Sequence, residues 1–178
     1  EYNKDMIKIG ITGQAGFVLS KGALTTNTAG EVDIRKALVE KGMVDCIVNL
    51  PTKLFLNTQI PACLWFLSRN KSDGTFRKRD NEILFIDARN MGHLINRKNR
   101  IFSDEDSALI SGTYHNWRNP DGNYEDVAGF CKVATIEEVG KLNYILTPGR
   151  YVGLADEEDD FDDDNDNDGD YDDEMDTE

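Results

Sequence analysis

Short apolar runs separated by polar loops indicate the strands of this chain. Two of them, residues 44–50 and 62–67, are rich in β-branched and aromatic side chains and are too short for helices of normal length. They contain too few polar residues for strands with one solvated face, so they predict strands buried on both faces of an α/β sheet. A third such run at 15–19, within a strand at 15–20, also predicts a strand buried on both faces, and the run at 82–87 predicts a further strand.

A helical pattern joins the strands at 15–20 and 44–49. Residues 31–41 place apolar side chains at helical spacing, and Gly42 follows at a position where helices commonly end. The apolar side chains are those of Ile34, Ala37 and Leu38. A strand, a helix and a strand within roughly 35 residues predict a βαβ unit, whose two strands are parallel. The strand at 62–67 follows a loop too short for a crossover helix, so we predict that it runs antiparallel beside its predecessor.

Two capping boxes predict helices in the second half of the chain. Ser103 precedes three acidic residues and begins a helix that ends at the turn sequence 119–122. The buried stripe of this helix consists of Ile110, Tyr114 and Trp117. Aromatic residues at that spacing indicate packing rather than a platform for stacked bases. Thr135 and Glu138 form the second capping box, which opens a short helix, and no regular element is expected over residues 143–154.

Charge divides the chain into a nearly neutral body and an acidic end. The net charge is −14, from 34 acidic and 20 basic residues, and 16 of the acidic residues fall within 156–178. Residues 1–155 therefore carry 18 acidic and 20 basic residues. Self-repelling acids cannot bury a core, so we predict a disordered tail at 156–178. The remaining chain is expected to comprise a leader at 1–14, an α/β domain at 15–102 and a helical extension at 103–155.

The cysteines and the short apolar runs indicate a reducing, aqueous compartment. Cys46, Cys63 and Cys131 are odd in number and form no Cys-x-x-Cys pair. We therefore expect small buried side chains rather than disulfides or metal ligands. The longest strictly apolar run, 62–67, is too short to span a membrane, so no membrane partner is expected. These features predict a cytoplasmic protein.

The loop at residues 50–60 is the first candidate functional segment. Loops that follow parallel strands leave the carboxyl edge of the sheet, where ligands bind in open α/β sheets. Pro51 and Pro61 stiffen the ends of this loop, and its apolar residues at 54–56 are expected to be exposed. The alternative is a plain connection between two strands, and the residues by themselves leave both interpretations open.

Two groups of cations form the second candidate, because clustered cations pair with nucleic-acid phosphates. The groups are Arg77, Lys78 and Arg79 in one polar loop, and Arg97, Lys98 and Arg100 in the next. A solvated loop is the alternative for both. His93 and His115 are isolated and indicate neither catalysis nor a metal site. No metal site is predicted at 164–169 either, since Met175 stands where a calcium loop needs its closing carboxylate.

Several motifs resemble, in the same order, those of the modification subunit of type I restriction–modification systems. One is Leu-Pro-Thr-Lys-Leu-Phe at 50–55, and the others lie at 15–24, 34–38, 84–88, 104–106 and 143–152. By this resemblance the chain forms the second half of the class I, Rossmann-like sheet of an adenine-specific DNA methyltransferase that uses S-adenosylmethionine. The resemblance also implies three partners, namely DNA, a specificity subunit and a restriction subunit.

The same resemblance makes the loop after residue 50 the target-base loop, which receives an adenine flipped from the duplex. Phe55 is then expected to stack on the flipped base. Thr58 lies nearby, Lys53 contacts a phosphate, and Pro51 and Pro61 bound the loop. A Phe55 that only fills the core is the alternative, because most phenylalanines are core residues.

Two parts of the family pattern are absent from these 178 residues. The glycine-rich cofactor loop and the catalytic Asn-Pro-Pro-Phe tetrapeptide of the family both lie before the equivalent of Ala15. The resemblance therefore assigns no catalytic or cofactor-binding residue here, and S-adenosylmethionine is not expected to bind this chain alone. A missing amino-terminal half is the implied partner, and the strand at 15–19 is expected to be an unprotected edge. The second hypothesis is a non-enzymatic remnant whose acidic tail binds basic partners or imitates DNA.

Overall fold

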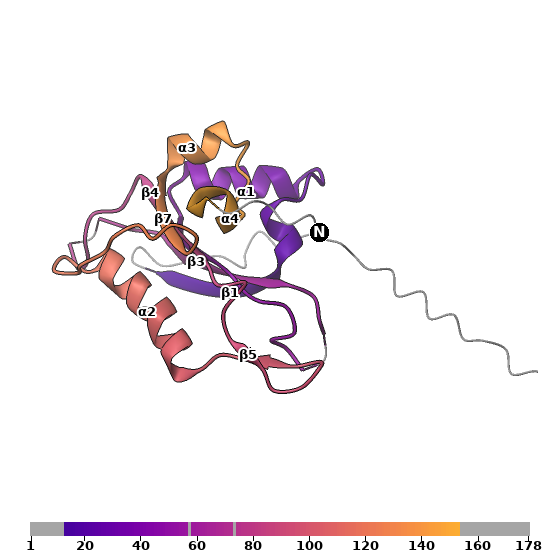
Figure 1. Cartoon of the computed structure of the whole chain (residues 1–178). Coiled ribbons are helices and arrows are strands. Elements are labelled where there is room, and N and C mark those ends of the chain that lie inside the picture. Colours follow the sequence, from indigo (N-terminus) through magenta and orange to yellow (C-terminus); the bar gives the residue numbers. More distant parts are fainter. Residues whose placement is uncertain (1–12, 57, 73, 154–178) are drawn as a thin grey trace, which may run out of the picture.

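The computed structural model describes residues 13–56, 58–72 and 74–153, and five strands in these ranges form one mixed sheet with the order β1-β3-β2-β4-β7. These strands are β1 (Gln14–Ser20), β2 (Val44–Asn49), β3 (Ala62–Ser68), β4 (Glu82–Asp87) and β7 (Cys131–Thr135). Helices cover both faces of the sheet, which gives three layers (Figure 1). One face carries α1 (Glu31–Glu40), α3 (Ile136–Lys141) and α4 (Pro148–Val152), and the other carries α2 (Asp104–Arg118). A 3-10 turn, η1 (Lys21–Leu24), follows β1, and a small hairpin consists of β5 (His93–Leu94) and β6 (Arg100–Ile101).

The directions of the strands confirm two expectations from the sequence. β3 runs antiparallel to both β1 and β2, so β1 and β2 point the same way with β3 between them. β4 is parallel to β2, and β7 is antiparallel to β4. The carboxyl ends of β1, β2 and β4 therefore share one edge of the sheet, which we call the carboxyl edge, and their amino ends share the amino edge.

The central strands separate two apolar cores, as their composition predicts. Every residue of β2 is buried, and so are five of the six residues of β4. Side chains of alternate strand residues pack under α1, α3 and α4 on one face and under α2 on the other. The three cysteines are buried and free, as expected: Cys63 lies in the first core, and Cys46 and Cys131 lie in the second.

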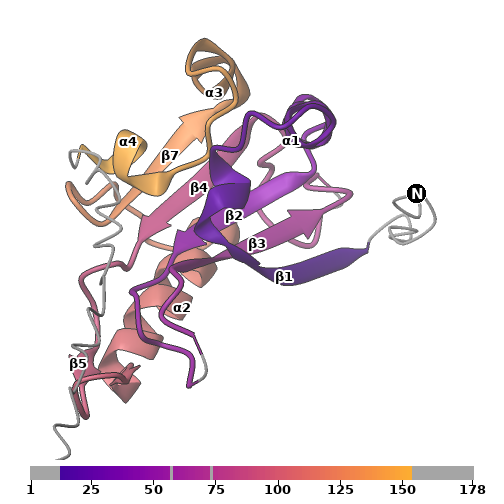
Figure 2. The same cartoon turned by 90° about the vertical axis from the view of Figure 1, so that its right-hand side faces the viewer.

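The expectation that strand 15–19 is buried on both faces is wrong. Phe17, Val18 and Leu19 are 38%, 56% and 42% exposed. β1 is the last strand of the sheet at that side, and among the described residues only β3 pairs with it (Figure 2). Within the described residues, the apolar composition of β1 is that of an inner strand, whereas its position is that of an edge strand.

The second half of the chain is less purely helical than its capping boxes suggest. Both boxes are confirmed, with Ser103 accepting from the Asp106 amide and Thr135 from the Glu138 amide. Between them, however, β7 extends the main sheet beside β4. α4 also contradicts the absence of a regular element after residue 143. Its Tyr151 ring stacks on Phe85 of β4 with centroids 3.8 Å apart, so tertiary packing rather than local propensity holds this helix.

The expected leader and acidic tail lie mostly or wholly outside the described residues, which begin at residue 13 and end at residue 153. Within residues 13–56, 58–72 and 74–153, no helix combines the length and the apolar character that crossing a membrane requires.

Candidate functional site

The loop at residues 50–60 leaves the carboxyl edge between β2 and β3, and its stem is fixed. Leu50 and Pro51 are buried, and the Leu50 amide donates to the Ala62 carbonyl at 3.0 Å. The Pro61 carbonyl accepts from the Lys21 amide at 2.9 Å, which ties the other end of the loop to the turn after β1. Pro51 and Pro61 therefore stand at the anchored ends of the loop. Phe55 and Leu56 are exposed as expected, but the expectation that Leu54 is exposed is wrong, because it is partly buried and packs against the core beneath α2.

The outer part of this loop forms a tight turn. Phe55 and Thr58 make an isolated antiparallel bridge, and the Thr58 hydroxyl accepts from the Ile60 amide at 3.1 Å. The Phe55 side chain is 38% exposed, so it is neither a core residue nor fully solvated. The sequence placed Phe55 and Thr58 near each other in this loop, and the structure brings them together directly.

The β5–β6 hairpin is fastened to the loop through Lys53. The Arg100 amide donates to the Lys53 carbonyl at 2.8 Å, and Lys53 Nζ donates to the Arg97 carbonyl at 3.3 Å. Lys53 has a φ of 66°, in the left-handed region that few side chains favour, so these contacts hold a strained backbone. Arg97, Lys98 and Arg100 thus lie beside the candidate loop, at the lower end of the molecule in Figures 1 and 2.

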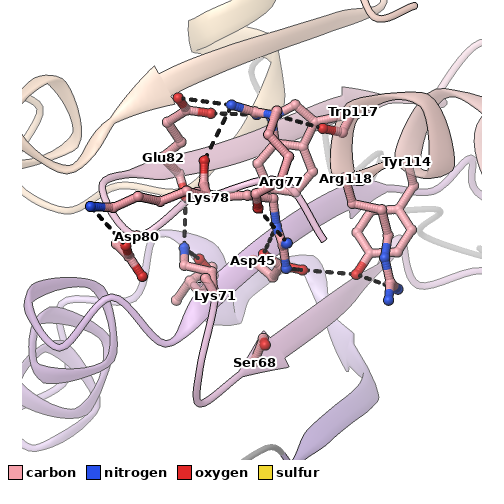
Figure 3. Close-up of polar contacts among 12 residues, drawn as sticks. Asp45, Ser68, Lys71, Arg77, Lys78, Asp80, Glu82, Tyr114, Trp117 and Arg118 are labelled. Atoms are coloured by element: carbon pink, nitrogen blue, oxygen red, sulfur yellow. Dashed lines mark hydrogen bonds and ion pairs between the residues drawn. The ribbon is translucent and has the colours of Figure 1, made fainter. Parts of the chain in front are cut away.

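The other predicted cation group lies at the amino edge, away from the loop. Arg79 is 2% exposed, and its guanidinium donates to both oxygens of Asp45 at 3.1 and 3.2 Å (Figure 3). Arg77 pairs with Glu82 at 2.6 Å, and only Lys78 is well exposed. The expectation that Arg79 contacts a DNA backbone is therefore wrong, and the two cation groups do not form one surface. The partner of Arg79 lies 34 residues earlier in the chain, where a local pattern of cations cannot indicate it.

We call this group around Asp45 the Asp45 cluster; its members are Asp45, Lys71, Arg77, Arg79, Glu82, Tyr114 and Arg118. The Tyr114 hydroxyl donates to Asp45 Oδ2 at 2.8 Å, and burial, followed by the Asp45 charge, raises the pKa of Tyr114. Arg77 Nε donates to the Trp117 carbonyl at 2.9 Å. The cluster therefore ties α2 to β2 and to the loop before β4 (Figure 3). Its role is to hold the layers together, which confirms that Tyr114 and Trp117 are packing residues.

Lys71 is the most unusual charge in the Asp45 cluster. It is 2% exposed, and its Nζ donates to the carbonyls of Val44 and Glu82 at 2.8 and 2.7 Å. Burial lowers the pKa of Lys71 to about 8, and the positive charge of Arg79 acts in the same direction. Three carboxylates oppose this shift, those of Asp45, Asp80 and Glu82.

This shift predicts a stability change with pH. The pKa of Lys71 is lower in the folded protein than in the unfolded chain, so the unfolded chain binds more protons between about pH 8 and pH 10. The free energy of unfolding should therefore rise through this window by roughly 2 kcal/mol relative to a Lys71→Met variant. Urea unfolding at several pH values measures the difference. Lys78→Met, which removes an exposed lysine, is the control, and an equal pH dependence in both variants would contradict the prediction.

A second buried group of polar side chains lies at the carboxyl edge and was not indicated by any sequence pattern. Asp87 ends β4, and its carboxylate accepts from the Arg89 amide at 3.1 Å and from the Arg89 guanidinium at 2.8 Å. The Asn49 carbonyl at the end of β2 accepts from the Ala88 amide at 2.9 Å. A Cβ atom at Gly149 would overlap the Arg89 guanidinium, so a larger residue where α4 covers this pair would displace the Arg89 side chain. This group fixes the ends of β2 and β4, from which the candidate loop and the hairpin emerge.

Apolar space is found on the α2 side of the sheet. One cavity of about 410 Å³ lies between the sheet and α2, lined mainly by Val48, Leu64, Phe66, Phe102 and Ile110. Another, of about 440 Å³, lies where α2 meets the segment before β7. Neither is lined by the exposed residues of the candidate loop. Among the described residues no group of His, Cys, Asp and Glu is arranged to hold a metal ion.

Comparison with known proteins identifies the family. The family model described as N-6 DNA methylase matches residues 5–160. The chain belongs to the N-6 DNA methylase family.

The relatives of this N-6 DNA methylase chain are methylase subunits of type I restriction enzymes. The HindI methylase subunit of Haemophilus influenzae is 49% identical over 148 residues, which are 83% of this chain and 32% of that protein. The MjaIX methylase subunit of Methanocaldococcus jannaschii is 41% identical over 150 residues, which are 83% of this chain and 26% of that protein. The resemblance to type I modification subunits inferred from the sequence motifs is therefore confirmed.

Solved structures agree with this assignment. A type I methyltransferase subunit from Streptococcus thermophilus superposes with a TM-score of 0.67 and 31% identity over 80% of this chain and 27% of that protein. The EcoKI M protein has a TM-score of 0.62 at 16% identity, which shows a shared fold, over 84% of this chain and 36% of that protein. The mixed α/β fold of the N-6 DNA methylase chain is thus that of type I modification subunits. The chain spans about a quarter to a third of the length of the curated relatives named above.

Proposed function

We propose that this N-6 DNA methylase chain supplies the target-base loop of an adenine-specific DNA methyltransferase that uses S-adenosylmethionine. The observation that carries the proposal is a half-exposed Phe55 in a turn on an anchored loop, at the carboxyl edge of a methylase sheet. Transfer of a methyl group to adenine requires that the base leave the duplex. A ring presented at the edge of the sheet can hold the extruded base by stacking on its face. Thr58, bridged to Phe55, fixes the geometry of the turn.

The cofactor site and the catalytic tetrapeptide belong, in this proposal, to sequence outside these 178 residues. We propose that this outside sequence pairs with β1. An edge strand with apolar side chains on both faces favours pairing with another strand, and β1 exposes Phe17, Val18 and Leu19. The strands β1, β3 and β2 then form the final part of a Rossmann-like sheet. The present chain alone is expected to be inactive.

The cations beside the loop support contact with DNA. Lys53 belongs to the target-base loop, and Arg97 and Lys98 belong to the hairpin that is hydrogen-bonded to it, so all three are placed to pair with phosphates flanking the extruded base. Arg100 is partly engaged, since its guanidinium donates to the Met91 and Gly92 carbonyls. We propose that the complete enzyme works in the cytoplasm with a specificity subunit and a restriction subunit, as type I systems do. Recognition of the DNA sequence is then delegated to the specificity subunit.

Cofactor binding by the chain with and without its partner tests the proposal. Calorimetry on the isolated 178-residue chain should give no saturable signal with S-adenosylmethionine, and the chain should self-associate through its open β1 edge. Adding the amino-terminal part of its methylase should restore a monodisperse complex, cofactor binding and methyl transfer to DNA. A micromolar cofactor signal from a monomer of this chain alone would refute the half-enzyme proposal.

The acidic composition of residues 156–178 favours a second candidate, a non-enzymatic interaction protein. Sixteen acidic residues without a single Lys or Arg could bind a basic partner or imitate the charge of DNA. The same mixing experiment separates the two candidates. An interaction protein would show no methyl transfer with any amino-terminal partner. Duplex DNA would compete with the acidic residues for the basic partner, and this competition would depend only on charge.

A further inference from the structure

Leu56, at the tip of the target-base loop, is the most exposed large hydrophobic side chain in the described part of the chain. It is 83% exposed, whereas the neighbouring Phe55 is 38% exposed. The turn that carries it is closed by the bridge between Phe55 and Thr58. Leu56 is not a single case, because Phe55 and Ile60 of the same loop and Leu94 and Ile95 of the adjoining hairpin are also exposed. A group of exposed apolar side chains, unlike a lone one, indicates a surface that is covered in use.

The turn is presented on a stem that resists displacement. The Leu50 backbone is hydrogen-bonded to β3, and the Pro61 backbone is hydrogen-bonded to the turn after β1. The Arg100 amide of the hairpin donates a hydrogen bond to the Lys53 carbonyl. A side chain that must enter a packed structure needs such support, since a loose loop would yield instead. Leu56 is therefore an exposed apolar side chain on a loop that backbone hydrogen bonds hold in place.

The charges of the side chains around Leu56 indicate which kind of molecule covers this surface. The neighbouring side chains include those of the partly buried Lys53 and the exposed Arg97 and Lys98, and no acidic residue lies between positions 89 and 100. The acidic residues 104–106 follow closely, but they form the first turn of α2, where the Asp106 carboxylate accepts from the Ser103 amide. An apolar tip among cations matches a nucleic acid, in which apolar base faces are enclosed by phosphates.

We propose that Leu56 inserts into the base stack of the duplex where the target adenine leaves it, and so holds the extruded state open. This inference rests on the proposed function of the loop. Apolar wedges of this kind offset part of the cost of unstacking, which is a few kcal/mol per base step. Leu56 would fill the space in the duplex while its chain neighbour Phe55 holds the extruded base. Leu56 is thus a positioning residue and Phe55 contacts the substrate.

The test compares two duplexes in a complete methylase that contains this chain. One duplex carries the adenine that the enzyme methylates in its normal pair, and the other carries the same adenine opposite an abasic site, where little stacking and no pairing oppose extrusion. Leu56→Ala should slow methyl transfer about tenfold on the paired duplex and less than about twofold on the unpaired one. Leu56→Met should retain most of the rate. Phe55→Ala should slow transfer on both duplexes.

Leu142→Ala is the matched control, because Leu142 is a partly exposed leucine that follows α3 in the opposite layer of the molecule. It should leave both rates unchanged. Equal losses on the two duplexes in Leu56→Ala, or no loss on either, would overturn the wedge while leaving the proposed function intact. A Leu56→Ala variant that changes only self-association would also overturn the wedge, because it would show that Leu56 contacts a second copy of the chain. If the complete wild-type enzyme methylated neither duplex, the proposed function itself would be refuted.

Discussion

Replacing Phe55 with alanine in a complete methylase that contains this chain is expected to lower the rate of methyl transfer roughly 100-fold, at the upper end of what one stacked base contributes. The reason is that the loop presents a half-exposed ring at the carboxyl edge, whereas the cofactor site is proposed to lie elsewhere. The affinity for S-adenosylmethionine should therefore stay almost constant. Single-turnover methylation and calorimetry with the cofactor measure the two quantities separately.

Phe55→Tyr provides the control for this result, because it keeps an aromatic face at the same position. It should retain most of the activity if stacking is the function of the ring. Equal losses of methyl transfer and cofactor affinity in Phe55→Ala, accompanied by a lower thermal midpoint, would mean that Phe55 only supports the fold.

Asp45→Ala is expected to destabilise the chain by about 4 kcal/mol. Both members of the ion pair with Arg79 have side chains that are 1% exposed, so the variant leaves a buried guanidinium without its carboxylate. It also removes the acceptor of the Tyr114 hydroxyl. Urea unfolding followed by fluorescence of Trp65 and Trp117, both buried, measures the loss of free energy.

Two variants define what this loss means. Glu137→Ala breaks an exposed ion pair with Lys141 and should leave the free energy of unfolding almost unchanged. Replacing both Asp45 and Arg79 with apolar residues of similar volume should recover much of the loss, because no uncompensated charge remains. An Asp45→Ala variant as stable as Glu137→Ala would show that the Asp45 cluster is dispensable.

Strands with a strong apolar signal were predictable from the sequence, and elements held by tertiary contacts were not. β2, β3 and β4 each form a nearly continuous apolar run, which is the pattern of strands buried between two helical layers. β7 contains the exposed Lys132 in a five-residue segment, so its pattern is too weak to stand out. α4 begins with proline and glycine and depends on the stacking of Tyr151 against Phe85. Its helical state follows from that packing, which the local sequence does not reveal.

Charged residues show the same limit of local patterns. The cations at 77–79 and 97–100 look alike in the sequence, yet the first group lies at the amino edge and the second beside the loop at residues 50–60. Arg35 is a further case: helical spacing points to Ile34 as the inner residue, but Ile34 is 54% exposed and Arg35 is buried. Arg35 donates to the carbonyls of Tyr144 and Thr26, so distant backbone acceptors decide which side chain turns inward.

The three cysteines lie in different cores, so their reaction with a thiol reagent can show which side of the sheet opens. Cys63 lies in the core beneath α1, α3 and α4, whereas Cys46 and Cys131 lie in the core beneath α2. All three thiols are buried, so the rate at which a thiol reagent labels each sulfur reports how readily its surroundings open. Timed labelling followed by mass spectrometry would resolve the order in which the two layers detach, without any engineered probe. The same readout would register whether contact with DNA slows the exposure of the α2 layer, which lies on the side of the sheet next to the hairpin (Figure 1).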